Sequence, residues 1–342
     1  MKAPIRGNVM NTRRKFLAAL GAWALAAPLA SFAQKPGKVW RIVFLAPDSP
    51  ESNPGAPDAY STAFLREMQA AGHTFGADYV IELRSAEGDY QRLPGLAKEL
   101  VRLNADIILP VSPIAVSAAY QASKTVPIVC IGAHDPVGLG LAASLARPGG
   151  NLTGLATFYA DLIPKHLELL KSIMPKASRV AILANVKAMV EDTAVEKAIR
   201  EAAQLLGMRL QIVTIESTEQ LPRAFAAMAR ERAVGFITIA DVMFLRERRQ
   251  IAELALKHRL ASLFADRENV QAGGLLSYGE DFVEVFAQAA RYVSKIMKGA
   301  KPGDLPIEQP TKLHLAINRK TAQALKLAIP RELLLRADEV IG

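Results

Sequence analysis

Short apolar runs with the composition of buried strands alternate along this chain with helix-length amphipathic segments. The strand-like runs lie at 41–45, 79–83, 106–109 and 126–131, and again at 179–184, 210–215, 235–239 and 261–264. Strands separated by helices of ten or more residues form parallel sheets with helices on both faces. The alternation therefore predicts an α/β protein, and its occurrence in two similar series predicts two lobes of like fold.

Residues 126–156 mark the passage from the first series to the second. A strand-like run at 126–131 is followed by a loop at 132–138 and by an apolar run at 139–145, which we expect to be helical. The sequence Arg147-Pro148-Gly149-Gly150-Asn151 ends that run, and 152–156 is typical of one more short strand. The alternation then resumes, so this segment closes the first lobe.

The C-terminal part interrupts the alternation and indicates that the chain returns to the first lobe. A long amphipathic helix is expected at 282–297, followed by a loop rich in proline and glycine at 298–310. We predict a first lobe of residues 39–153 plus about 279–304, and a second lobe of 154–278 plus about 305–342.

Composition and charge narrow the class of protein. Hydrophobic residues make up 51% of the 342-residue chain, enough for two full cores. Of the formal net charge of +9, five charges belong to the first fifteen residues: Lys2, Arg6, Arg13, Arg14 and Lys15. The remaining +4 is scattered among acids, which does not indicate a nucleic-acid binder. The single cysteine, Cys130, excludes an internal disulfide, and its apolar surroundings predict an inert buried thiol.

The first 33 residues have the pattern of an export signal. Arg13-Arg14-Lys15-Phe16-Leu17 precedes an apolar stretch, 18–29, that is too short and alanine-rich for a membrane span. Ser31-Phe32-Ala33 predicts cleavage before Gln34. The paired arginines resemble a twin-arginine signal, and a general secretory signal remains the alternative. We expect a soluble periplasmic protein after cleavage near Ala33.

Polar residues that directly follow the strands are the candidate ligand contacts. In open parallel sheets, ligands bind beyond the carboxyl ends of the strands, and in two lobes these ends can face one another. The candidates are Asp48, Ser49, Ser112, Pro113, Ala133, His134, Asp135, Asn185, Asp241 and Tyr278. Backbone N–H groups of the helix after Ser112 can hold a carboxylate, Asp241 or Asp135 can pair with an ammonium group, and Tyr278 can stack on the ligand. Each also has a purely structural reading, as a helix cap, a turn residue or a core aromatic.

Other motifs in the sequence are weaker evidence for a nucleotide site, a metal site or an enzyme. Gly138-Leu139-Gly140-Leu141-Ala142-Ala143 fits the loose dinucleotide fingerprint, but His134-Asp135-Pro136 separates its glycines from the strand. The five histidines lack zinc-ligand spacing, so we expect neither a metal nor a cofactor. His134-Asp135 leaves an exported α/β enzyme open as a rival, although the nucleophile turn of α/β hydrolases is absent.

Several longer motifs resemble the substrate-binding proteins of ABC transporters of the tryptophan/tyrosine type. These motifs lie at 87–94, 135–138, 144–154, 273–279 and 305–312. The resemblance implies a type I periplasmic binding protein, with two Rossmann-like lobes, a multi-strand hinge and no catalysis. It further implies that a captured solute, such as an amino acid or an aromatic acid, is delivered to a membrane permease with its ATPase.

Two loops depart from that family's usual pattern. The third-strand loop usually contains Gly-Gly-Thr-Pro, and here Pro110-Val111-Ser112-Pro113 keeps a hydroxyl before proline. The first loop of the second lobe often contains Asn-Pro-x-Asn-Pro, and here it is Asn185-Val186-Lys187-Ala188-Met189. Lys187 would add a cation that favours a more acidic solute, although we favour an exposed lysine at a helix start.

The sequence thus predicts a solute receptor that closes around its ligand. The expected hinge lies near Thr153, Gly154, Gly279 and Leu305. The expected partners are a small carboxylate-bearing solute and an ABC permease with its ATPase, with no nucleic acid, and we expect a monomer. A receptor that feeds a chemosensor is a second rival, whereas a sugar-responsive repressor is disfavoured by the export signal.

Overall fold

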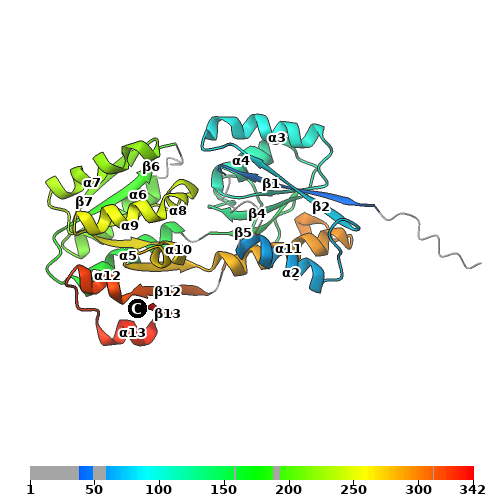
Figure 1. The fold of residues 1–342 in the computed structure, drawn as a ribbon. Helices are drawn as coiled ribbons and strands as arrows, with labels where there is room; N and C mark the ends of the chain where they lie inside the picture. Colours follow the sequence, from blue (N-terminus) through cyan, green and yellow to red (C-terminus); the bar gives the residue numbers. More distant parts are fainter. Residues whose placement is uncertain (1–37, 49–58, 158, 188–192, 311) are drawn as a thin grey trace, which may run out of the picture. The chain divides into compact units, whose positions relative to one another are not determined.

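The computed structural model describes residues 38–48, 59–157, 159–187, 193–310 and 312–342 (Figure 1). Residues 39–342 form one compact unit. The predicted export signal and the candidate Ser49 lie outside the described residues. No helix in the described part of the chain is both long and apolar enough to cross a membrane.

The first sheet has six parallel strands in the order β11-β5-β4-β3-β1-β2. Their bounds are β1 Trp40–Ala46, β2 Tyr79–Ser85, β3 Ile107–Pro110, β4 Ile128–Ala133, β5 Leu152–Ala156 and β11 Ile307–Glu308. Because β3 and β4 are covered on both faces, they are apolar throughout, and β1 and β5 are apolar except for Arg41 and Thr153.

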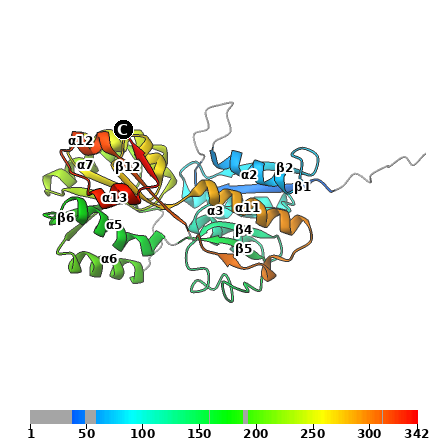
Figure 2. The same ribbon diagram turned by 90° about the horizontal axis from the view of Figure 1, so that it is seen from below.

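Helices cover both faces of this sheet. Helices α2 (Ala59–Ala70) and α11 (Phe282–Met297) lie side by side on one face, although more than 200 residues separate them in the chain (Figures 1 and 2). Ile42 packs among their side chains. Helices α3 (Leu93–Arg102) and α4 (Pro113–Ala122) cover the other face, where the next residue along β1, Val43, packs. Successive strand residues thus serve two separate cores.

The second sheet has seven strands in the order β13-β12-β10-β9-β8-β6-β7. Their bounds are β6 Arg179–Asn185, β7 Arg209–Ile215, β8 Gly235–Thr238, β9 Ala261–Phe264, β10 Leu276–Glu280, β12 Leu313–Asn318 and β13 Glu339–Ile341. Strands β6 to β10 run parallel, β12 is antiparallel to β10, and β13 is parallel to β12. The alternation in the sequence predicts the parallel part, and the β12–β13 edge is built from the C-terminal tail.

Two layers of helices also cover the second sheet. One layer contains α5 (Tyr159–Ile173), α6 (Thr193–Leu205), α12 (Arg319–Ala324) and α13 (Arg331–Arg336). The other contains α7 (Leu221–Arg230), α8 (Val242–Arg246) and α9 (Arg248–Lys257). Short elements complete the fold: α10 (Arg267–Gln271) and the 3-10 turns η1 (Tyr90–Arg92), η2 (Thr218–Gln220) and η3 (Pro302–Asp304). The predicted α/β class with two largely parallel sheets is confirmed.

Two details of the sequence reading need correction. The run 139–145 forms turns and bends, not a helix. Gly140 takes a left-handed φ of +67°, and only seven residues separate Gly140 from the Pro148 that follows, so no helical ladder forms. Ile307 and Glu308 pair with β5 in the first sheet, whereas the prediction assigns everything after about 305 to the second lobe. The chain therefore passes to the second sheet only after β11.

Candidate functional site

A buried hydrogen-bond network joins residues that follow strands of both sheets. The Tyr90 hydroxyl, beyond the end of β2, donates to Asp241 Oδ2 at 2.7 Å. Asn185, the last residue of β6, donates from Nδ2 to the Tyr90 hydroxyl at 3.2 Å and to Asp241 Oδ1 at 3.3 Å. Tyr90 and Asn185 are 6% and 2% exposed, so these groups satisfy one another with little help from solvent.

An ion pair lies beside this network. Asp48 follows β1 and is 5% exposed, and Arg246, at the end of α8, donates from Nη1 to its Oδ2. Glu247 also accepts from Arg246 Nε at 3.2 Å. Burial is the main reason that the pKa values of Asp241 and Tyr90 are raised, and the negative charge of Asp48 adds a smaller contribution to both. The pair is costly to break from the Arg246 side, because Asp48 is buried and would be left charged without its counter-ion.

Local structure explains how the second sheet presents these groups. The helix α8 begins four residues after the end of β8, and Asp241 is its N-cap, with Oδ1 accepting from the Met243 N–H at 2.9 Å. Arg246 ends the same five-residue helix. The backbone N–H of Ile239 bonds to Leu183 O at 2.8 Å, which continues the β6–β8 pairing and brings Asp241 beside Asn185. One short helix thus supplies an anion and a cation.

Burial sets the electrostatics of the network. Desolvation is the largest cause that raises the pKa of Asp241, and the Tyr90, Met243 and Asn185 hydrogen bonds oppose it. Desolvation also raises the pKa of Tyr90, followed by the repulsion of the Asp241 charge. The tyrosine therefore stays a neutral donor. Asp241 Oδ2 accepts one bond, from Tyr90, and an ionised carboxylate oxygen can accept two.

The structure brings three sequence-predicted residues together: Asp48, Asn185 and Asp241. Tyr90 and Arg246 were missed. Both lie farther along the chain than the residues that directly follow a strand, Tyr90 in the 3-10 turn η1 and Arg246 at the far end of α8. Asp89 caps η1 by accepting from Gln91 N–H at 3.2 Å, a signal in the sequence that marks Tyr90 as the start of a turn at the strand ends.

The other predicted residues of the first lobe lie at the same sheet edge. Val111 bonds through its N–H to Leu45 O and Ser112 to Ile131 O, so Ser112 sits between the ends of β1 and β4. Ser112 has a φ of +102°, caps α4 through the Ala115 N–H at 3.4 Å, and is followed by Pro113 in the first turn. A non-glycine residue with such a φ is strained, which is common at functional positions.

The loop after β4 begins buried and becomes exposed. Ala133 is fully buried at the end of β4, His134 is half-buried, and Asp135 is exposed. Asp135 has a φ of +34° and its Oδ1 accepts from the Gly138 N–H at 2.9 Å, so this carboxylate serves its own turn. Its structural reading as a turn residue is the one that the geometry favours.

Tyr278 lies in β10 and packs half-buried against the core of the second lobe. Its carbonyl is 2.6 Å from His166 Nε2, and the two rings meet edge to face with centroids 6.4 Å apart. Burial lowers the pKa of His166 to about 4, which keeps this imidazole neutral. These contacts give Tyr278 a structural role.

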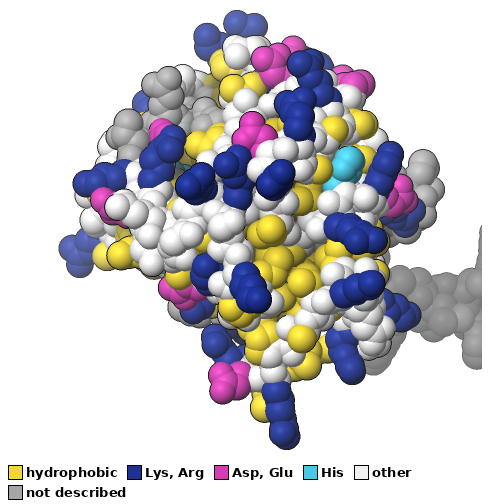
Figure 3. Space-filling view, turned by 90° about the vertical axis from the view of Figure 1, so that its left-hand side faces the viewer, with side chains coloured by type: hydrophobic (Ala, Val, Ile, Leu, Met, Phe, Trp, Pro, Cys, Tyr) yellow, Lys and Arg dark blue, Asp and Glu magenta, His cyan; other side chains and the backbone are white. Residues whose placement is uncertain are grey.

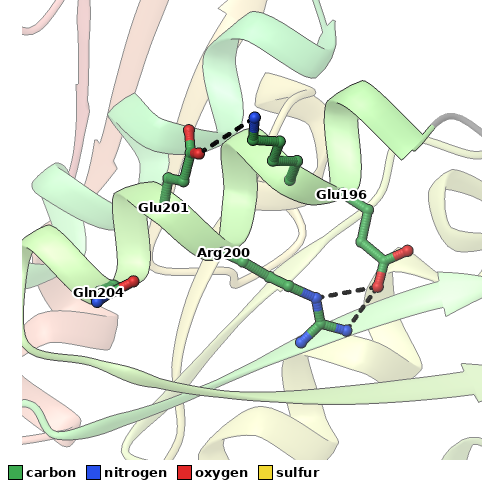
Figure 4. Close-up of a pocket in the computed structure, with 5 residues that line it drawn as sticks. Glu196, Arg200, Glu201 and Gln204 are labelled. Carbon is green, nitrogen blue, oxygen red and sulfur yellow. Dashed lines mark hydrogen bonds and ion pairs between the residues drawn. The ribbon is translucent and has the colours of Figure 1, made fainter.

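A shallow hollow on helix α6 is a solvated helix face. Arg200 pairs with Glu196 at 2.6 Å and Lys197 with Glu201 at 3.8 Å, both at i,i+4 spacing (Figure 4). These side chains are more than half exposed, so such pairs contribute only a few tenths of a kcal/mol each (about 0.3–0.5). The hollow lacks the convergent buried groups of a ligand site.

Comparisons with known proteins identify the family. The family model described as ABC transporter substrate binding protein matches residues 54–341. The chain belongs to this family. A curated relative, a tyrosine-binding protein of Clostridioides difficile, is 24% identical over 285 residues, covering 82% of this chain and 81% of its own. Proteins of the substrate-binding family bind solutes and are not enzymes, so the expectation of a non-enzymatic protein is confirmed.

Solved structures of similar fold include other substrate-binding proteins. A conserved domain protein of Vibrio cholerae superposes with a TM-score of 0.78 at 24% identity, over 89% of this chain and 100% of its own. The ABC domain in complex with L-Trp from Streptococcus pneumonia gives 0.75 at 22% identity, with the same coverage of both chains. The ligand-free, open substrate-binding protein with adhesive properties from Clostridium difficile gives 0.62 at 22% identity. These similarities establish the type I periplasmic binding protein fold.

The expected hinge residues lie close to the segments where this substrate-binding protein passes between its sheets. Thr153 and Gly154 are within β5, where Thr153 Oγ1 donates to Leu305 O at 3.0 Å. Gly279 is within β10. The passages themselves follow β5, β10 and β11, and Thr157 Oγ1 donates to Glu280 Oε1 at 3.0 Å to link the first two. The hinge assignment stays a prediction.

Proposed function

We propose that this protein is the periplasmic solute-binding component of an ABC importer. It captures a small carboxylate-bearing solute, an amino acid or an aromatic acid, where the two lobes meet and delivers it to a permease with its ATPase. Substrate-binding proteins of ABC importers act outside the cytoplasm, in keeping with the export signal expected at 1–33. A tyrosine-binding relative and an L-Trp complex of the same fold support an amino acid with an aromatic side chain.

The observation that carries the proposal is the bond of Tyr90, from the first lobe, to Asp241, from the second. Residues from two sheets converge on one buried point, as a site that closes around a solute requires. Asp48 and Asn185 join that point. The polar groups there include an anion, Asp241, and a cation, Arg246, which can pair with the ammonium and carboxylate groups of an amino acid.

Asp241 is the proposed acceptor of the solute ammonium group. Its Oδ2 has a lone pair to spare beside the Tyr90 bond, and burial strengthens any charge–charge interaction there. Ser112 and the N–H groups at the start of α4 are the proposed carboxylate site, and Arg246 of the second lobe, which pairs with Asp48, is a cation available to the same carboxylate. Pro113, Ala133 and His134 would line the wall, with Asp135 and Tyr278 farther from the contacts.

Binding measurements with matched analogues test this assignment. L-Tyr and L-Trp should raise the melting temperature and bind in calorimetry. Tyramine and tryptamine lack the carboxylate, and 3-(4-hydroxyphenyl)propionate and indole-3-propionate lack the ammonium group, so each should bind at least tenfold more weakly, roughly the loss of one charge-assisted hydrogen bond. A broad library of amino acids and aromatic acids without any thermal shift would refute the proposed solute class.

The Asp241→Asn variant separates the ammonium contact from general damage. It should weaken L-Tyr or L-Trp at least tenfold but leave weak binding of the analogue without an ammonium group unchanged, because only the charge pair is lost. Glu253→Gln, an exposed carboxylate on α9, is the matched control and should bind like the parent chain. If Asp241→Asn weakened the binding of the amino acid and of the analogue without an ammonium group equally, the assigned role would be contradicted.

A further inference from the structure

The end of the second sheet opposite to the candidate site is formed by five turns, which we call the basic face. Four of them lead into β6, β7, β8 and β9, at 174–178, 206–209, 230–234 and 257–260, and the fifth, 325–330, follows α12. Hydrogen bonds join neighbours among the first four: Arg209 N–H to Ser178 O at 2.8 Å and Ala261 N–H to Val234 O at 3.1 Å. Val234 N–H also bonds to Arg179 O at 3.0 Å, so the first four turns lie side by side, and Leu327 and Ile329 of the fifth turn pack on the same core as Met174, Leu206 and Val234.

Charge is concentrated on the basic face. Its seven exposed cations are Lys176, Arg209, Arg230, Arg232, Lys257, Arg259 and Lys326. Its one carboxylate, Glu231, pairs with Arg179 at 2.6 Å. The five turns thus carry +6, whereas residues 39–342 as a whole carry +2, from 35 cations and 33 anions. None of the seven cations forms an ion pair with another residue in the described part of the chain.

Three of these cations occupy positions where glycine or asparagine is the favoured residue. Arg232, Arg259 and Lys326 each follow the end of a helix, α7, α9 or α12, with a φ of 56–60°. Left-handed backbone is strained for a residue with a Cβ, and at the equivalent end of α6 the chain uses Gly207. These cations also compensate the negative ends of the helix dipoles, and their side chains are exposed to solvent.

Apolar side chains lie between the cations. Met174, Leu206, Val234, Leu327 and Ile329 are half-buried against the core of the second lobe and leave part of their surface to solvent. Figure 3 looks onto this end of the second sheet, where yellow side chains gather among many dark-blue ones and few magenta ones. Cations surrounding shallow apolar surface are the pattern of proteins that rest on the headgroup region of a bilayer.

We propose that the basic face docks reversibly on an anionic phospholipid bilayer. Five strand spacings separate β7 from β12, so the face is roughly 24 Å wide, broad enough for several lipid headgroups. Dispersed cations on a broad surface match a plane of negative charge better than a single acidic peptide, which would occupy one groove. Docking through this end leaves the candidate solute site, at the opposite ends of the strands, facing away from the lipid.

Vesicle binding of charge-reversal variants tests the proposal. The triple variant Arg232→Glu, Arg259→Glu, Lys326→Glu is compared with Lys98→Glu, Arg102→Glu, Lys301→Glu, three exposed cations of the first lobe. Both triples change the net charge equally. With vesicles of phosphatidylcholine containing about a third phosphatidylglycerol, the first triple should partition at least roughly tenfold less than the parent chain, and the second within about twofold of it.

A site-specific readout covers the case of a triple that folds poorly. Cys130 is buried, so a cysteine at the exposed Ala328 can be labelled alone with an environment-sensitive dye, with Gln91→Cys as the control position. The Ala328 dye should shift its emission on anionic vesicles only, and the shift should fade between roughly 0.05 and 0.5 M salt. Intact-mass measurements check that every variant has the same N-terminus. Any contribution of residues 1–38 to vesicle binding is then the same in all variants.

Any one of four results would overturn the proposal. The first three are equal losses for both triples, equal dye shifts at both positions, and no preference for anionic over pure phosphatidylcholine vesicles. Binding of the basic face to an acidic protein without vesicle binding would also overturn it. The solute response of the parent chain and of the first triple should be alike, so failure of the solute assignment and failure of the docking proposal are distinguishable.

Discussion

Asp266 offers a measurable link between burial and stability. It follows β9 as the N-cap of α10, yet its side chain makes no capping hydrogen bond. Burial, followed by the charges of Glu268 and Glu280, raises the pKa of Asp266 to about 7 from 3.8. The adjacent Arg267 is directed to Asp281, 3.6 Å away, and to Glu268, 3.7 Å away. At neutral pH this carboxylate therefore opposes folding.

The sign of the effect follows from proton linkage. The folded protein holds the Asp266 proton more tightly than the unfolded chain does, so stability from this group is fully present below pH 3.8 and is lost as pH rises through about 7. The gap of about three pKa units corresponds to about 4 kcal/mol. Because the residue is partly exposed, solvent screening reduces this, and we expect about 2 kcal/mol.

Asp266→Asn keeps the shape of the side chain and removes its titration. The variant should match the parent chain near pH 4 and exceed its free energy of unfolding by about 2 kcal/mol at pH 8.5. Urea denaturation followed by circular dichroism at several pH values measures this difference, in which the titrations of all other groups cancel. Glu253→Gln, on the exposed face of α9, is the control. A difference that does not change between pH 5 and 8.5, or a variant less stable at pH 8.5, would refute the reasoning.

Three further predictions each rest on the surroundings of one residue. Tyr90→Phe should lose about 1–3 kcal/mol of unfolding free energy, measured in urea, because Asp241 loses a buried donor; Tyr120→Phe, whose ring lies under the Lys124 ammonium, should lose little. Gly154→Ala should lower the melting temperature far more than Gly72→Ala, because a Cβ at Gly154 would stand 2.5 Å from Cys130 O while Gly72 has open space and only its φ to strain. The Cys130 thiol, whose pKa burial raises to about 12, should react with a thiol reagent only in denaturant; rapid labelling of the folded chain would contradict its burial.

The sequence predicts the architecture well because each strand is a compact apolar signal. Buried strands such as β4 are apolar throughout, and that run is visible without any knowledge of its neighbours. The run at 139–145 is equally apolar, but Gly140 turns the backbone to the left and the helix fails. Composition also suggests that this segment is buried, yet Leu139 is 47% exposed and Ala142 is its one buried residue.

The candidate site is predictable only in part. The sequence predicts where strands end, but it does not predict which long side chains extend to the site from neighbouring turns and helices. Asp48 and Asp241 come two and three residues after a strand and Asn185 ends one, so the rule that ligands bind at strand ends finds them. Tyr90 and Arg246 reach the same point from the turn and the helix that follow, and spacing along the chain does not tell where a long side chain ends. Residues with long side chains in the first turns after strands should therefore be treated as candidate site residues, together with the residues at the strand ends.

The direction of a parallel sheet gives the second lobe two chemically opposite ends. Each helix returns antiparallel to its strand, so helix N-termini gather where strands end and helix C-termini gather where strands begin. Asp241 caps the N-terminus of α8 at one end, and Arg232 and Arg259 follow the C-termini of α7 and α9 at the other. Acid and base thus complement the helix dipoles at opposite ends of one lobe. Combining Asp241→Asn with the basic-face triple should therefore give additive changes in solute and vesicle binding, because the groups share no contacts. Strong coupling between the two would mean that solute and lipid surface act on the same part of the molecule.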